Sequence, residues 1–252
     1  MAALLRHVSP GRLLLGVCLG VVLFVLLLQA VFVLRVLWYS HFNPGPTPVM
    51  RAAMSELWRQ QPEAELRYQW VDYDAISPAL KQAVIASEDS RFLQHRGADW
   101  DAIRAAWEHN RDLAARRAAA EQAGRELPRG TLRGASTITQ QTAKNLFLSN
   151  DRSYWRKAQE LVLAWMMETF MSKRRILELY LNIAEWGNGV FGAEAAARHH
   201  FGRGAGQLSA RQAAQLAARL PNPRFYDTRG VTSYLNSRTN TIAARLRHAE
   251  IP

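Results

Sequence analysis

The pattern of hydrophobic and polar positions separates one long apolar segment from a helical remainder. Leu13 to Leu34 is a run of 22 residues that only Gln29 and two glycines interrupt, and Arg12 and Arg35 bound it. A helix of this length is about 33 Å long, enough to cross the hydrocarbon core of a bilayer. A cleaved signal peptide has a shorter apolar region, about 7–15 residues, that ends at a small-x-small site. This run has no such site, so the pattern predicts an uncleaved transmembrane anchor.

The residues around this segment predict its orientation. Arg6 and Arg12 precede the apolar run, and basic residues are retained on the cytoplasmic side of a membrane. Trp38 and Tyr39 follow it, as aromatic residues at a membrane interface do. We therefore expect a single-pass protein of the inner (cytoplasmic) membrane, with a cytoplasmic N-terminus and a periplasmic domain. The one cysteine, Cys18, lies inside the run, so no disulfide or cysteine-based metal site is expected.

The rest of the chain is predicted to be mostly α. Ser77 followed by Pro78 is typical of a helix start, and Thr137 with Gln140 has the spacing of a capping box. The helix expected at 154–170 is apolar on nearly every side after Glu160, which predicts burial in the middle of a domain. Further elements are expected as a helix near 176–184, a helix that begins at Ser209 and stops before Pro221, and a strand at 67–73.

Composition divides the chain further. Residues 40–49 are rich in proline and typical of a spacer. Residues 109–133 carry six arginines and three acidic residues, which fits either a solvated loop or a segment on a membrane surface. We therefore predict a leader at 1–12, an anchor at 13–34, a juxtamembrane spacer at 35–65 and one domain at 66–252, which includes a mobile basic lobe at 109–133.

The net charge of +11 indicates polyanionic partners, such as nucleic acid, anionic lipid or a phosphate-bearing substrate. The anchor and the outward topology argue against nucleic acid. Two carboxylates are candidates for catalysis. Glu88 ends an apolar helix, and Glu160 lies on the most apolar helix, where a charge is costly unless it is used or paired. Either could instead form a structural salt bridge, and Arg156 at i−4 could be the partner of Glu160.

A polar and cationic cluster follows the predicted helix start at Ser136. Basic side chains near a helix N-terminus form a suitable anion site, although an ordinary solvated helix face is the alternative. His199 and His200 are adjacent on a predicted helix, so we do not expect them to face one metal site. The members of the cluster are Gln140, Gln141, Lys144, Asn145, Arg152, Arg156 and Lys157.

Four short strings of the sequence, given at the end of this paragraph, together resemble the motifs of the family 51 glycosyltransferases, the peptidoglycan transglycosylase module. The resemblance covers roughly residues 75–225 in four ordered motifs. Neither a Ser-x-x-Lys nor a Lys-Thr-Gly motif occurs, so the chain resembles the monofunctional form without transpeptidase activity. The matching strings are Glu88-Asp89-Ser90-Arg91-Phe92, Gly134-Ala135-Ser136-Thr137-Ile138-Thr139-Gln140-Gln141 with Lys144-Asn145, Arg156-Lys157 with Glu160, and Lys173 to Asn182.

The resemblance implies a lysozyme-like helical domain that polymerises glycan strands from lipid II for cell wall biogenesis. It implies that Glu88 is the general base, and that Glu160 assists near the departing pyrophosphate. Lys144 and Arg152 would hold the pyrophosphate or a sugar. No tightly bound cofactor is expected, and Mg²⁺ or Mn²⁺ would associate with the substrate pyrophosphate. Further residues expected to bind the substrate are Ser136, Gln140, Gln141, Asn145, Asp89, Phe92 and Arg156.

Two other functions fit the same residues. A lytic enzyme of the same fold type would cleave glycan strands, but it has no pyrophosphate to hold, so the cationic cluster favours synthesis. A scaffold without activity would not need both Glu88 and Glu160. Besides lipid II, the lipid-linked glycan chain and the membrane, proteins of the divisome or elongation complex are expected as partners.

Overall fold

The apolar run forms helix α1, Pro10–His41, in the computed structural model, which describes residues 10–126, 130, 132–149, 151 and 153–252. By length and composition it is the one helix of the described residues that could cross a membrane. It makes up most of one compact unit, which ends at Phe42, and a second unit runs from Asn43 to Pro252.

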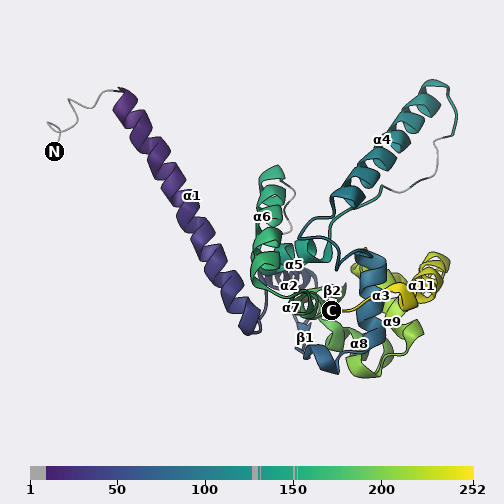
Figure 1. The fold of residues 1–252 in the computed structure, drawn as a ribbon. Coiled ribbons are helices and arrows are strands. Elements are labelled where there is room, and N and C mark those ends of the chain that lie inside the picture. The colour runs from purple at the N-terminus through teal and green to yellow at the C-terminus, as the bar shows by residue number, and fades with distance from the viewer. Residues whose placement is uncertain (1–9, 127–129, 131, 150, 152) are drawn as a thin grey trace. The chain divides into compact units, whose positions relative to one another are not determined.

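The second unit is mostly α over the residues described, as the sequence predicts (Figure 1). Three of its helices, α3, α9 and α11, pack against one another, and a second group joins α5 to α6 and α7. The helices are α2 Pro48–Gln60, α3 Pro78–Glu88, α4 Trp100–Gln122, α5 Ile138–Phe147, α6 Tyr154–Phe170, α7 Lys173–Ile183, α8 Ala193–Phe201, α9 Ala210–Arg219, α10 Pro223–Arg229 and α11 Ser233–Arg245, with 3₁₀ turns η1 Tyr73–Ala75, η2 Ala205–Gln207 and η3 Leu246–His248.

The predicted helix starts are confirmed, with one difference. Thr137 caps α5 in a capping box: its hydroxyl accepts from the backbone N–H of Gln140, whose side-chain oxygen accepts from the backbone N–H of Thr137. Ser77 stands at the N-cap position of α3 and Pro78 follows it. The Ser77 hydroxyl, however, donates to the carbonyl of Leu208 and makes no capping bond, because α3 begins against the loop before α9.

A small sheet lies beside these helices. Strands β1, Arg67–Tyr68, and β2, Glu185–Gly187, flank β3, Val190–Phe191; β1 is parallel to β3 and β2 is antiparallel to it. The strand predicted at 67–73 is therefore shorter than expected. Gly192 after β3 has φ +86°, and a Cβ there would lie 2.7 Å from the carbonyl oxygen of Asn182, so this turn needs glycine. The sheet places Glu185 directly after α7.

Helix α6 differs from its prediction. Leu163, Ala164 and Met167 are buried, but Trp155 is 87% exposed and Trp165 62% exposed. The helix therefore buries one face only, and its apolar character continues onto the exposed face. A helix that is apolar on nearly all sides is expected to lie in apolar surroundings. The sequence alone does not show whether these surroundings are a protein core or a lipid surface.

Helices α2 and α4 lie in segments that the sequence analysis assigned to the spacer and the lobe. Helix α2 lies within the predicted spacer 35–65, and it packs against α5 through a buried face that includes Met50 and Met54. Helix α4 covers the first part of the predicted lobe 109–133 and buries only Ala106 and Leu113. The domain boundaries and the mobility of the lobe stay predictions.

Candidate active site

Two adjoining cavities in the second unit share Gln141 and Pro221 in their walls. The larger has a volume of about 530 Å³ and is lined by Ser87, Glu88, Ser136, Arg238 and two tyrosines, Tyr226 and Tyr234, among others. The smaller has a volume of about 220 Å³ and is lined by Lys144, Asn145, Tyr180, Glu185 and Pro223, among others. The two cavities therefore bring together residues from α3, α5, α7, β2 and α11.

Glu88 is the last residue of α3, and its carboxylate lies in the larger cavity with 12% of the side chain exposed. Burial raises the pKa of Glu88, although hydrogen bonds from Gln141 and Ser87 and the charge of Arg238 oppose this. The Gln141 amide donates to Oε2 over 3.2 Å, and the Ser87 hydroxyl donates to Oε1 over 3.1 Å. A largely buried carboxylate with a raised pKa is a stronger proton acceptor than an ordinary glutamate, as a general base requires.

Gln141 links Glu88 to the opposite wall. Its side-chain oxygen accepts a hydrogen bond of 3.2 Å from the hydroxyl of Tyr180, a buried residue of α7, while its amide N–H donates to Glu88. Because both ends of the amide are used, its orientation is fixed, and with it the position of the Glu88 carboxylate. The sequence predicts that Gln141 binds substrate, whereas Tyr180 stands there only within the matching string from Lys173 to Asn182.

Arg238 is a site residue that sequence reasoning missed. It lies on α11, and its Nη2 is 3.8 Å from Glu88 Oε1 and donates to the hydroxyl of Ser87 over 3.1 Å. It lies 150 residues from Glu88, and no helix start or spacing marks it, so only the packing of α11 against α3 reveals it.

Lys144 lies in the smaller cavity, partly buried on α5. Burial lowers the pKa of Lys144, and the charges of Glu160 and Glu185 oppose this. Over the described part of the chain its ammonium has no hydrogen-bond or ion-pair partner, so its three N–H donors are available to an anionic ligand. Asn145 lies beside it in the same wall.

Glu160 is 3% exposed and is paired as the sequence allowed. Arg156 donates to Oε2 over 2.7 Å, and Lys157 donates to Oε1. Lys157 also donates to the hydroxyl of Ser136 over 3.2 Å, which connects this ion-pair group to the larger cavity. Arg152, predicted to hold an anion, lies outside the described residues.

Besides Arg156, three predicted substrate-binding residues are not among the residues that line the two cavities. Asp89 is buried, and its carboxylate accepts from the ring of His95 and, over 3.0 Å, from the backbone N–H of Ile138 at the start of α5. Phe92 is fully buried. Gln140 is 1% exposed and is used in the α5 cap. Asp89 and Gln140 thereby hold the start of α5, the helix that carries Gln141.

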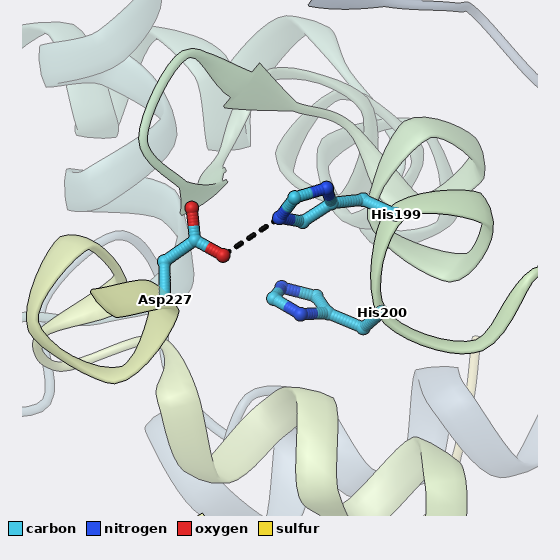
Figure 2. A group of neighbouring side chains, drawn as sticks. All are labelled: His199, His200 and Asp227. Carbon is cyan, nitrogen blue, oxygen red and sulfur yellow. Dashed lines mark hydrogen bonds and ion pairs between the residues drawn. The ribbon is translucent and has the colours of Figure 1, made fainter. Parts of the chain in front are cut away.

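His199 and His200 lie closer together than their adjacent positions on one helix suggest. Ligand atoms of both, with one of Asp227 from α10, lie within 4.8 Å of one another (Figure 2). His199 nevertheless uses both ring nitrogens: Nδ1 lies 2.6 Å from Arg67 Nη1, and Nε2 lies 2.6 Å from Asp227 Oδ1. Arginine only donates, so Nδ1 accepts and Nε2 carries the proton.

His199 of α8 therefore links β1 to α10 through its hydrogen bonds with Arg67 and Asp227. These three residues and His200 are called the clasp. His200 Nε2 donates to the carbonyl of Trp186 over 2.9 Å, and burial lowers the pKa of His200 to about 4. A guanidinium in contact with His199 disfavours a cation there, so the clasp is not suited to a divalent metal.

A family model and several similar proteins indicate the same family for this chain. A family model described as "Transglycosylase" matches residues 54–247. A protein of Bordetella pertussis named "Biosynthetic peptidoglycan transglycosylase" is 55% identical over 247 residues, which cover 98% of both chains. Proteins with the same name from Herminiimonas arsenicoxydans and Methylobacillus flagellatus are 51% and 48% identical, over 96% and 94% of this chain and 98% and 96% of their own.

Proposed function

Because this chain belongs to the transglycosylase family, we propose that it polymerises the glycan strands of peptidoglycan. It is a glycosyltransferase of cell wall synthesis, and its substrates are lipid II and the lipid-linked glycan chain. The proposal rests on the arrangement of two groups: Glu88, a largely buried carboxylate, bonds to Gln141, and Gln141 also lines the cavity that holds Lys144. The Lys144 ammonium has no partner among the residues that the structure describes. Attack by a hydroxyl and departure of a pyrophosphate need such a base and such a cation.

In the proposed reaction the 4-hydroxyl of the lipid II GlcNAc gives its proton to Glu88 and attacks the anomeric carbon of the growing chain. The bond from that carbon to the pyrophosphate oxygen breaks, and undecaprenyl pyrophosphate leaves with the electron pair. One displacement converts an α-linkage to a β-1,4 linkage. Lys144 stabilises the charge that develops on the leaving group. Glu160 keeps Arg156 and Lys157 beside this centre, which is consistent with a supporting role.

The membrane supplies these lipid-linked substrates. Helix α1 anchors the protein in the inner membrane, with the N-terminus in the cytoplasm and the domain in the periplasm. The length and composition of α1 support the anchor, and Arg12 before the run supports the orientation. The exposed Trp155 and Trp165 of α6 are side chains typical of a membrane interface. Proteins of the divisome or elongation complex would be further partners.

The function is tested with the purified full-length chain in detergent. Labelled lipid II is offered in one assay and purified sacculi in another. Glycan polymer from lipid II, with the sacculi intact, is the expected result. Solubilised sacculi without polymer would identify a strand-cleaving enzyme and overturn the proposal.

Replacing Arg238 by alanine is expected to shift the pH dependence of polymerisation. Glu88 must be ionised to act as a base, so activity falls as the pH falls through its raised pKa. Removing the arginine charge raises that pKa further, because a nearby opposite charge favours the ionised carboxylate. The acid limb of kcat/KM should therefore move to higher pH. An unmoved acid limb would contradict the pairing of Arg238 with Glu88.

Any Mg²⁺ or Mn²⁺ is proposed to bind the substrate pyrophosphate and to supply charge neutralisation there. The described residues of the two cavity walls offer only Glu88 and Glu185 as carboxylates, which does not make a tight protein site. A chelator is therefore expected to slow polymerisation without changing the thermal unfolding midpoint. Metal retained at one equivalent after dialysis of the substrate-free protein would contradict this.

A further inference from the structure

Glu185, which the sequence did not single out, lies in the wall of the smaller cavity together with Lys144. It is the first residue of β2, and 18% of its side chain is exposed. Burial raises the pKa of Glu185, while the charges of Arg224 and Lys144 oppose this. A carboxylate in such surroundings is costly unless it is paired or used, so its partners decide what it does.

Only half of the Glu185 carboxylate is occupied. Arg224 Nε of α10 donates to Oε1 over 2.7 Å, and Arg224 Nη1 extends outward to Glu56, 3.1 Å away and 59% exposed. The other oxygen, Oε2, has no hydrogen-bond partner among the residues that the structure describes. Arg224 thus fixes the orientation of the carboxylate and leaves one acceptor oxygen for the cavity.

A purely structural role, joining β2 to α10, is the alternative. That connection is already made by a second contact: the backbone N–H of Asn188, after β2, donates to Asp227 Oδ2 of α10 over 2.9 Å. Asp227 in turn is held by His199 in the clasp. The alternative also gives no reason for a carboxylate beside Lys144 in a cavity wall.

We propose that Glu185 is a substrate-positioning residue, whose free Oε2 accepts a hydrogen bond from a hydroxyl or amide N–H of the saccharide that carries the pyrophosphate. A glycosyl pyrophosphate presents anionic oxygens next to neutral donors. Lys144 binds the anionic oxygens of the pyrophosphate, and Glu185 accepts from the neutral donors of the saccharide. If the substrate were displaced so that the pyrophosphate lay at Glu185, the negative charge of Glu185 would repel it. The pair thereby sets the register of the donor. This rests on the proposed function.

Glu185 also affects the charge of Lys144. The groups that act on Lys144 are Glu160, Arg156 and Lys157 of α6 and Glu185 of β2. Glu185 favours the ammonium form, so its removal lowers the pKa of Lys144 further. The alkaline limb of the pH profile, where Lys144 loses its proton, should then move to lower pH. A role that only stabilises the fold would not move this limb.

The test compares Glu185→Gln and Glu185→Ala with Glu56→Gln in the full-length protein, with labelled lipid II as the substrate. Glu56→Gln removes an exposed carboxylate from the same arginine without touching the cavity. We expect Glu185→Ala to lower kcat/KM by about 10- to 100-fold, mainly through KM, as loss of a charged hydrogen bond does. Glu185→Gln keeps the size of the side chain and should still shift the alkaline limb, whereas Glu56→Gln should match the wild type.

The outcomes separate the two proposals. A wild-type kcat/KM and alkaline limb in both Glu185 variants would overturn the positioning role while the proposed function stands. Equal losses in Glu185→Gln and Glu56→Gln would also overturn it, because the effect would then belong to Arg224 and α10. A wild-type protein that makes no polymer would overturn the proposed function and this role with it.

Discussion

Replacing Glu88 by glutamine is expected to lower the rate of glycan polymerisation by about 10²–10⁴-fold, the usual contribution of a general base. The amide has the size of the carboxyl group and no basic oxygen with which to take the proton of the acceptor hydroxyl. Burial already disfavours the charge of Glu88, as its raised pKa shows. The thermal unfolding midpoint of the variant should therefore stay level or rise.

The rate is measured with labelled lipid II and the full-length chain, and Glu65→Gln is the matched control. Glu65 is exposed and lies outside both cavity walls, so that variant should keep the wild-type rate. Polymer at a similar rate from wild type and Glu88→Gln would keep the function and refute Glu88 as the base.

Replacing Lys144 by methionine should have the second-largest effect, a loss of about 10²–10³-fold in kcat, which is the usual cost of one missing group that stabilises transition-state charge. Methionine fills a similar volume without an ammonium group to stabilise the departing pyrophosphate. Because burial disfavours the Lys144 charge, the neutral side chain should not destabilise the fold.

Lys144→Arg supplies the control for charge. In the wild type, activity should decline as the pH rises through the lowered pKa of Lys144, since only the ammonium form acts. Arginine stays protonated over this range, so the alkaline decline should be lost or move to higher pH. An alkaline limb unchanged in Lys144→Arg would mean that another group causes it.

The features that the sequence predicts correctly are local. Helix α1, which could cross a membrane, follows from an almost continuous apolar run, and the start of α5 follows from Thr137 and Gln140, which bond to each other three residues apart. Glu88, Gln141 and Lys144 stand in short strings at fixed spacing, and the structure places all three in the walls of the two cavities, while their roles stay predictions. Each of these is determined by residues close together in the chain.

What was missed depends on distant parts of the chain. Arg238 and Tyr180 reach Glu88 and Gln141 only because α11 and α7 pack against α3 and α5. Glu185 becomes significant through Arg224, which α10 supplies. The same limit applies to Asp89: the family resemblance suggests that it binds substrate, whereas in the structure its carboxylate accepts from the backbone N–H of Ile138, 49 residues further along the chain.

The most direct test of the central claim, transfer of a glycan to a sugar hydroxyl, is the ratio of undecaprenyl pyrophosphate released to glycosidic bonds formed by the wild-type protein from lipid II. The account predicts a ratio near one, with a ladder of glycan products, and parallel loss of both in Glu88→Gln. Release of pyrophosphate without polymer would mean that water is the acceptor, and it would contradict the account.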